Sequence, residues 1–95
     1  MNKRTILKEI EKNKLKLRGF GVRKIGVFGS FLKGKQSKKS DIDLIAKFNE
    51  PNFDNYAEAL ILLEKLFRRK IDLLTESGLR PELNYIIGEA EYARI

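Results

Sequence analysis

Two aspartates separated by one residue, Asp41 and Asp43, open an apolar, β-prone segment that reads SDIDLIAKF. Side chains at positions i and i+2 of a strand lie on the same face. Two carboxylates held that close repel one another, and a bound divalent cation removes this conflict. Mg²⁺ takes hard oxygen ligands, commonly one or two protein carboxylates, with substrate phosphates and water at the other positions. The pair therefore predicts a metal-dependent nucleotide site.

A third aspartate, Asp72, lies between Ile71 and Leu73 in another short apolar run, KIDLLT. If its strand lies beside the strand of Asp41 and Asp43, three carboxylates converge. Two metal ions can then bind the attacking and leaving oxygens of an in-line displacement. An edge-strand aspartate that faces water is the alternative for Asp72, and the upstream pair favours the functional role.

The Gly29–Ser30 pair follows a β-like segment, and the next residues, FLK, can begin a short helix. Glycine lets a phosphate approach the backbone, while Ser30 offers a hydroxyl where the free N–H groups of a helix start point at an anion. By itself a Gly-Ser pair is better explained as an ordinary turn and N-cap. Its place upstream of the aspartates makes phosphate binding the favoured interpretation.

The order of these features along the chain is specific: Gly29, Ser30, Gly34, Ser40, Asp41 and Asp43, then a helix and a strand that carries Asp72. In this order the sequence resembles the minimal nucleotidyltransferases, small members of the DNA polymerase beta-like superfamily, over nearly its whole length. The resemblance implies two Mg²⁺ ions held by catalytic aspartates, which are Asp41, Asp43 and Asp72. It also implies an ATP substrate contacted by Gly29, Ser30, Lys33 and Ser40.

The loop within the motif, KGKQSKK, departs from the family pattern because it is unusually basic. Lys33 stands where many members have an arginine. This departure leaves the metal ligands intact and changes only the side chains near the nucleotide. The lysines of the loop either face solvent or reach triphosphate oxygens as point charges.

The resemblance also implies an activity and a partner. The activity is transfer of AMP from ATP to an acceptor hydroxyl, with release of pyrophosphate. Free-standing family members are commonly antitoxins whose partner toxin is a ribonuclease of the HEPN superfamily, and members adenylylate a tyrosine of that toxin. Two alternatives are a non-catalytic antitoxin that occludes the toxin and a small basic RNA-binding domain. Antibiotic nucleotidyl transfer is disfavoured, because no segment is left over to bind an aminoglycoside.

Composition limits the other possibilities. A length of 95 residues predicts one small domain that spans residues 1–95. The absence of cysteine and histidine excludes disulfides, thiolate chemistry and a Ser-His-Asp triad, so a general base must be a carboxylate or water. A net charge of +7 predicts attraction to polyanions or an acidic partner. No long apolar run suggests a membrane span or signal peptide, so we expect a cytoplasmic protein.

Periodicity predicts an α+β fold in which helices back a three-stranded mixed sheet, and the resemblance implies that this fold is nucleotidyltransferase-like. The expected elements are a helix over 3–18, strands over 23–28, 41–48 and 70–74, a helix over 55–69 and a last helix from Pro81. The aromatic residues follow core patterns, so direct nucleic-acid binding is not expected. Leu79, Tyr85 and Tyr92 are predicted to join the core, and the alternative is that they form an exposed apolar edge for a partner. Phe31 either joins it or flanks an adenine base.

Overall fold

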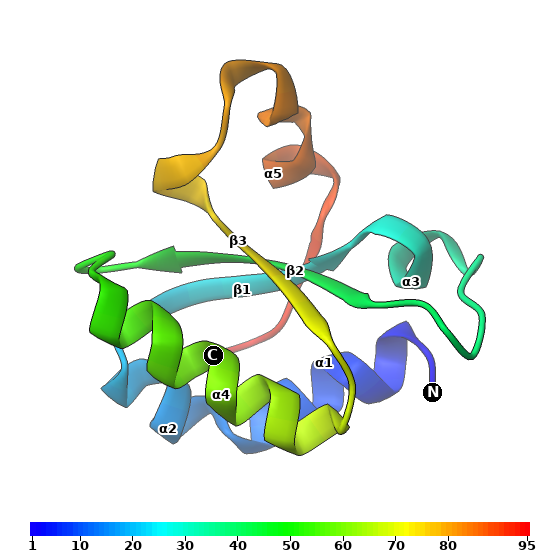
Figure 1. The fold of residues 1–95 in the computed structure, drawn as a ribbon, viewed down its shortest axis with the longest axis horizontal. Coiled ribbons are helices and arrows are strands. Elements are labelled where there is room, and N and C mark those ends of the chain that lie inside the picture. The colour runs from blue at the N-terminus through cyan, green and yellow to red at the C-terminus, as the bar shows by residue number, and fades with distance from the viewer.

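A four-stranded mixed sheet organises the chain, and the computed structural model describes residues 1–95. The strands lie in the order β3 (Ile71–Thr75), β2 (Ile42–Phe48), β1 (Val22–Phe28) and β4 (Glu91–Tyr92). β2 is parallel to β3 and antiparallel to β1, which also pairs antiparallel with β4. One face of the sheet is covered by α1 (Lys3–Lys12), α2 (Lys14–Gly19) and α4 (Phe53–Phe67) (Figure 1). The predicted α+β class is confirmed, with one strand more than expected.

The core lies between these three helices and the sheet because β2 alternates in polarity. Four of its side chains join the main hydrophobic core, namely Ile42, Leu44, Ala46 and Phe48. The intervening residues Asp43, Ile45 and Lys47 therefore lie on the opposite face. We call this opposite face, which is turned away from α1, α2 and α4, the open face. None of the helices is both long and apolar enough to span a membrane.

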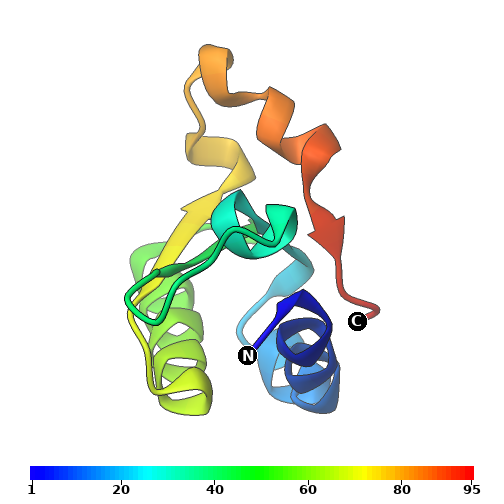
Figure 2. The same ribbon diagram turned by 90° about the vertical axis from the view of Figure 1, so that its right-hand side faces the viewer.

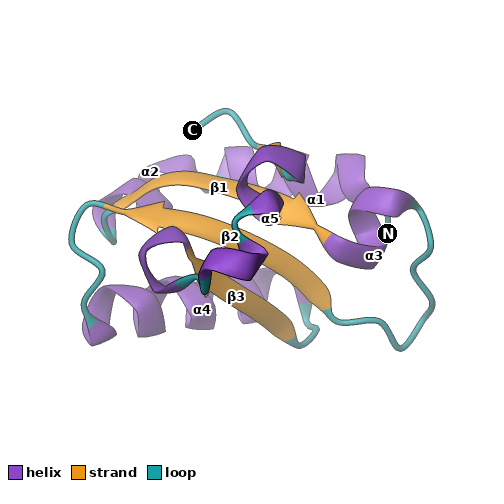
Figure 3. Ribbon diagram, turned by 90° about the horizontal axis from the view of Figure 1, so that it is seen from above, coloured by secondary structure: helices purple, strands orange, loops and turns teal.

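The chain after β3 stands over the open face, and it contains the predicted last helix only in part. A 3-10 turn, η1 (Glu76–Gly78), comes first; the region from Pro81 is a second 3-10 turn, η2 (Pro81–Leu83), followed by a five-residue helix, α5 (Tyr85–Glu89). Figure 2 shows this segment rising from the sheet and returning to its edge as β4. Seen from above in Figure 3, α5 lies over the strands and α3 (Gly29–Lys33) lies at one end of the sheet.

The unpredicted strand β4 has only two residues, and it is held by pairing with β1. Gly26 pairs with Tyr92, and a Cβ at Gly26 would lie 2.8 Å from the carbonyl oxygen of Glu91. Glycine therefore permits the close approach. Tyr92 and Leu79 are half-buried, whereas Tyr85 is 61% exposed, so the prediction that Tyr85 belongs to the core was wrong.

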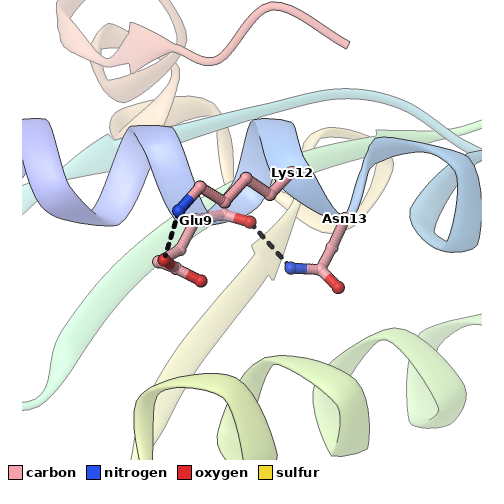
Figure 4. Close-up of polar contacts among 3 residues, drawn as sticks. All are labelled: Glu9, Lys12 and Asn13. Atoms are coloured by element: carbon pink, nitrogen blue, oxygen red, sulfur yellow. Dashed lines mark hydrogen bonds and ion pairs between the residues drawn. The ribbon is translucent and has the colours of Figure 1, made fainter.

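The predicted helix over residues 3–18 is two helices, because Asn13 interrupts it. The Asn13 side-chain amide donates to the carbonyl oxygen of Glu9 at 2.9 Å, and Lys12 pairs with the Glu9 carboxylate at 3.5 Å (Figure 4). An asparagine side chain that bonds the backbone competes with the regular helical pattern. The backbone of Asn13 leaves the helical region at φ −108° and ψ 19°, and α2 begins at the next residue.

Candidate active site

The two strands that carry aspartates are neighbours, as the sequence predicted. β2 and β3 run parallel, and Asp43 pairs in register with Asp72. Paired residues on adjacent strands lie about 4.8 Å apart and project from the same face. The register therefore places two carboxylates side by side on the open face.

Asp43 is the half-buried member of this group, and its environment disfavours a negative charge. Burial raises the pKa of its carboxyl above the usual value, and the charges of Asp72 and then Asp41 raise it further. The backbone N–H of Ser30 opposes these effects by lowering the pKa. An ionised Asp43 thus lacks a compensating positive charge, which a bound cation supplies.

Gly29 brings the β1–α3 turn against Asp43. Its φ is +72°, a left-handed conformation that residues with a Cβ rarely adopt. A Cβ at this position would overlap a carboxylate oxygen of Asp43 and lie 2.9 Å from its Cγ. Glycine is therefore required here for two separate reasons, its backbone conformation and the space that Asp43 occupies.

The three aspartates fit hard cations by chemistry, but they do not form a preformed three-ligand cluster. No group of three or more aspartate, glutamate, histidine or cysteine side chains is arranged to hold a metal ion. Asp41 is exposed and precedes β2 by one residue, so it lies outside the strand that fixes Asp43. The structure thus brings Asp43 and Asp72 together and leaves Asp41 beside them. Carboxylate oxygens are the ligands that Mg²⁺ prefers, and the assignment of all three as ligands stays a prediction.

Two residues assigned to the nucleotide make contacts within the protein. Lys33, at the end of α3, forms an ion pair with Glu89 of α5 at 3.6 Å. The hydroxyl of Ser40 accepts a hydrogen bond from the backbone N–H of Ser37 at 2.8 Å and so braces the loop. The contacts of Lys33 and Ser40 with a nucleotide remain predictions. Lys33 can contact a nucleotide only if its ion pair with Glu89 breaks.

Arg69 is a residue near the site that the sequence did not single out. It donates to the carbonyl oxygen of Ser40 at 3.1 Å, and its guanidinium lies 5.5 Å from the ring centroid of Phe31. Phe31 itself is 1% exposed, which decides in favour of the core. No local signal in the sequence marks this hydrogen bond, because its two residues are 29 positions apart.

A glycine-opened strand-to-helix turn beside paired strand aspartates defines a class of protein, the enzymes that transfer nucleotides with the help of divalent cations. The model of the nucleotidyltransferase domain family matches residues 3–95. The chain belongs to this family of enzymes.

Comparisons with known proteins agree with the family. Protein adenylyltransferase MntA of Thermococcus cleftensis is 40% identical over 62 residues, which is 64% of this chain and 63% of that protein. A solved structure described as a "putative minimal nucleotidyltransferase" superposes with a TM-score of 0.82 at 29% identity, over 96% of this chain and 95% of the other. The fold is therefore that of a minimal nucleotidyltransferase.

A second solved structure shares the fold alone. It is described as a complex of tri-AMPylated Shewanella oneidensis HEPN toxin with MNT antitoxin, and one chain of it matches. The match has a TM-score of 0.62 at 18% identity, over 90% of this chain and 70% of the matched chain.

Proposed function

We propose that this protein is a Mg²⁺-dependent protein adenylyltransferase that moves AMP from ATP onto a hydroxyl of a partner protein. The acceptor is a tyrosine of a HEPN-type toxin, and the modification makes this chain an antitoxin that acts in the cytoplasm. The observation that carries the proposal is the register of β2 and β3, which sets Asp43 beside Asp72. This carboxylate pair adjoins the Gly29 turn, so a place for cations and a place for phosphates are next to one another.

The residues divide the chemistry between them. Gly29 and Ser30 hold the triphosphate at the start of α3, since Gly29 lets a phosphate approach the backbone and Ser30 offers its hydroxyl, while the Ser30 N–H supports Asp43. Asp43 and Asp41 provide oxygen ligands for divalent cations. When bound, such cations neutralise the triphosphate and stabilise charge on the α-phosphate. Asp72 completes the ligand set and accepts the proton of the attacking hydroxyl.

The bond changes balance without a further reactant. The acceptor oxygen forms a bond to the α-phosphorus, the bond from that phosphorus to the bridging α–β oxygen breaks, and pyrophosphate leaves. The proton of the hydroxyl goes to Asp72. No histidine or cysteine is present in the chain to serve as an alternative base.

The choice of a protein acceptor rests on the relatives. One relative is named a protein adenylyltransferase, and a complex of a tri-AMPylated HEPN toxin with MNT antitoxin contains a chain with the same fold. We carry both the acceptor class and the antitoxin role over from these proteins. The role of Lys33 in this scheme is to exchange Glu89 for a phosphate oxygen of ATP.

The test is label transfer from α-³²P-ATP with Mg²⁺ into the protein and RNA of a lysate of the source cells, with γ-³²P-ATP as the control for phosphorylation. Label from the α-position on one helical protein, lost in an Asp41→Asn/Asp43→Asn variant, would support the proposal and identify the acceptor. Label on RNA would replace it with terminal nucleotide addition. No label in either pool would favour an occluding antitoxin or a binding module.

Asp72 allows a finer test of its assignment as base. We expect Asp72→Asn to abolish transfer while leaving most ATP binding, because the triphosphate contacts come from the Gly29 turn. Transfer should be followed by α-label incorporation and ATP binding by equilibrium dialysis. Transfer at the wild-type rate in this variant would refute the base assignment.

A further inference from the structure

The open face carries a second pair of like charges, which is basic rather than acidic. Lys24 of β1 pairs in register with Lys47 of β2. Side chains directly opposite each other in an antiparallel pair have Cβ atoms about 5 Å apart, and like charges there destabilise the sheet. Such a pair needs a counter-charge, just as Asp43 and Asp72 do.

A third cation joins this pair because β1 is irregular at its start. The register shifts between Val22 and Lys24, and both Arg23 and Lys24 are exposed as a result. A β-bulge of this kind re-aims a side chain that regular alternation would send to the other face. Arg23 is fixed further by donating to the side-chain oxygen of Asn49 at 2.8 Å.

These residues line a hollow at the end of the sheet, which we call the basic depression. It has a volume of about 360 Å³ and no hydrophobic lining residue. Its four residues are Arg23, Lys24, Lys47 and Asn49.

The protein itself neutralises only part of this charge. The ammonium of Lys24 lies 3.8 Å from a carboxylate oxygen of Glu76 and 4.5 Å from the ring centroid of Tyr92. Lys47 forms no ion pair, and Arg23 is bonded to a neutral amide. The basic depression therefore keeps an excess of positive charge that is directed at solvent.

The basic depression and the carboxylate pair share one face of one strand. Asp43 and Lys47 are four residues apart on β2, which corresponds to about 13 Å along the strand. β2 runs from the end of the sheet near α3 to the opposite end (Figure 3). The chain after β3 stands over this face between the two sites and buries Ile45, so a partner protein that contacts both sites must pass around that segment.

We propose that the basic depression binds an acidic segment of the acceptor protein and so positions the acceptor hydroxyl toward Asp43 and Asp72. This inference rests on the proposed function, since it assigns the docking contact for that reaction. Charge complementarity selects an anionic partner. The depression lacks aromatic and apolar side chains on which bases could stack, so carboxylates of a protein fit it better than a nucleic acid.

The first test is transfer kinetics on the labelled acceptor protein. We expect Lys47→Glu to raise the KM for the acceptor about tenfold, because it reverses a charge in a docking contact. The KM for ATP should stay within twofold of the wild-type value. Lys65→Glu is the matched control, since it makes the same charge change at an exposed position of α4 behind the sheet and should alter neither constant. Unchanged acceptor KM in Lys47→Glu would refute the docking role alone, whereas a wild-type protein that labels no protein would refute the proposed function.

A second test probes the depression directly by NMR of the ¹⁵N-labelled protein. Hexaglutamate should shift the backbone amide signals of Arg23, Lys47 and Asn49, and Lys47→Glu should abolish these shifts. Hexauridylate RNA that binds there more tightly at the same ionic strength would overturn the protein segment as occupant. No shift with either probe would overturn the depression as an anion site.

Stability separates loss of docking from loss of fold. Lys47→Glu replaces a repulsive pair with an attractive one opposite Lys24, so we expect its Tm to rise by about 1–8 °C. A variant that is more stable yet docks more weakly cannot owe its defect to misfolding. A lower Tm would contradict the view that Lys24 and Lys47 repel each other across the two strands.

Discussion

Adding a single methyl group at Gly29 tests how the turn after β1 supports Asp43. Gly29→Ala changes two things at once: it puts a Cβ on a residue with φ +72°, and that Cβ overlaps the Asp43 carboxylate. Gly34→Ala is a matched control for the first change. Gly34 has φ +71°, and a Cβ there meets nothing within 4 Å.

The magnitudes follow from this difference. A left-handed conformation costs an L-residue about 1–2 kcal/mol. Replacing a glycine also stabilises the fold by about 0.4–1 kcal/mol, because the unfolded chain has less conformational freedom to lose. Gly34→Ala should therefore lower the free energy of unfolding by about 1 kcal/mol, which is about 4–8 °C in Tm for a domain of this size. Gly29→Ala must also push Asp43 away from its rotamer for about 0.5–1.5 kcal/mol more. We expect Gly29→Ala to lower the free energy of unfolding by about 2 kcal/mol in total, which corresponds to about 8–16 °C in Tm.

The assay combines thermal unfolding with label transfer from α-³²P-ATP. Displacing a reacting group by about 1 Å can cost about a hundredfold in rate, so Gly29→Ala should lose at least that much transfer activity. The two variants should differ both in Tm and in the Mg²⁺ concentration that raises Tm. If Gly29→Ala were as stable as Gly34→Ala and transferred label within a few-fold of wild type, the argument that Gly29 makes room for Asp43 would be refuted.

Two further predictions concern Asp43 and Arg69. The pKa of Asp43 is raised in the folded state, so its carboxyl stabilises the fold when protonated, and this contribution is lost as pH rises through the folded pKa. In EDTA at pH 7, the Tm of Asp43→Asn should therefore be about 1–8 °C higher than that of the wild type, and near pH 3.5 the difference should be smaller. Addition of Mg²⁺ should raise the Tm of the wild type only. A Tm difference that is independent of pH would contradict the raised pKa of Asp43. Arg69→Ala removes the contact over Phe31 and the hydrogen bond to Ser40, so it should lower the free energy of unfolding by about 1–2 kcal/mol in chemical denaturation and speed amide exchange in the loop 34–40. Arg69→Lys with wild-type exchange would show that the guanidinium is not required.

Most regular elements could be predicted from the sequence because their signals are local. The polar and apolar residues of β2 alternate, and the apolar residues of α4 recur at helical spacing, so both patterns can be seen in the sequence. The structure places β2 at Ile42–Phe48 and α4 at Phe53–Phe67. The break at Asn13 was missed because asparagine is compatible with a helix until its side chain bonds a carbonyl. β4 was missed because two residues carry no periodicity and depend on their partner strand.

The candidate site divides in the same way. The sequence by itself determined which groups are available: Gly29 and Ser30 before a helix, two aspartates at strand spacing, a third in another strand, and no histidine or cysteine. Those are properties of residue type and short spacing, so they need no knowledge of the fold.

Only the tertiary structure decided which of these groups meet. Register between strands sets Asp43 beside Asp72, and the same sheet sets Lys24 opposite Lys47, although 23 positions separate the two lysines in the chain (47 − 24). A register is fixed by burial of one whole face of each strand against the helices, and a slip of one residue would send every side chain to the other face. That cooperative choice is made by the packed core as a unit, so no short stretch of sequence contains it.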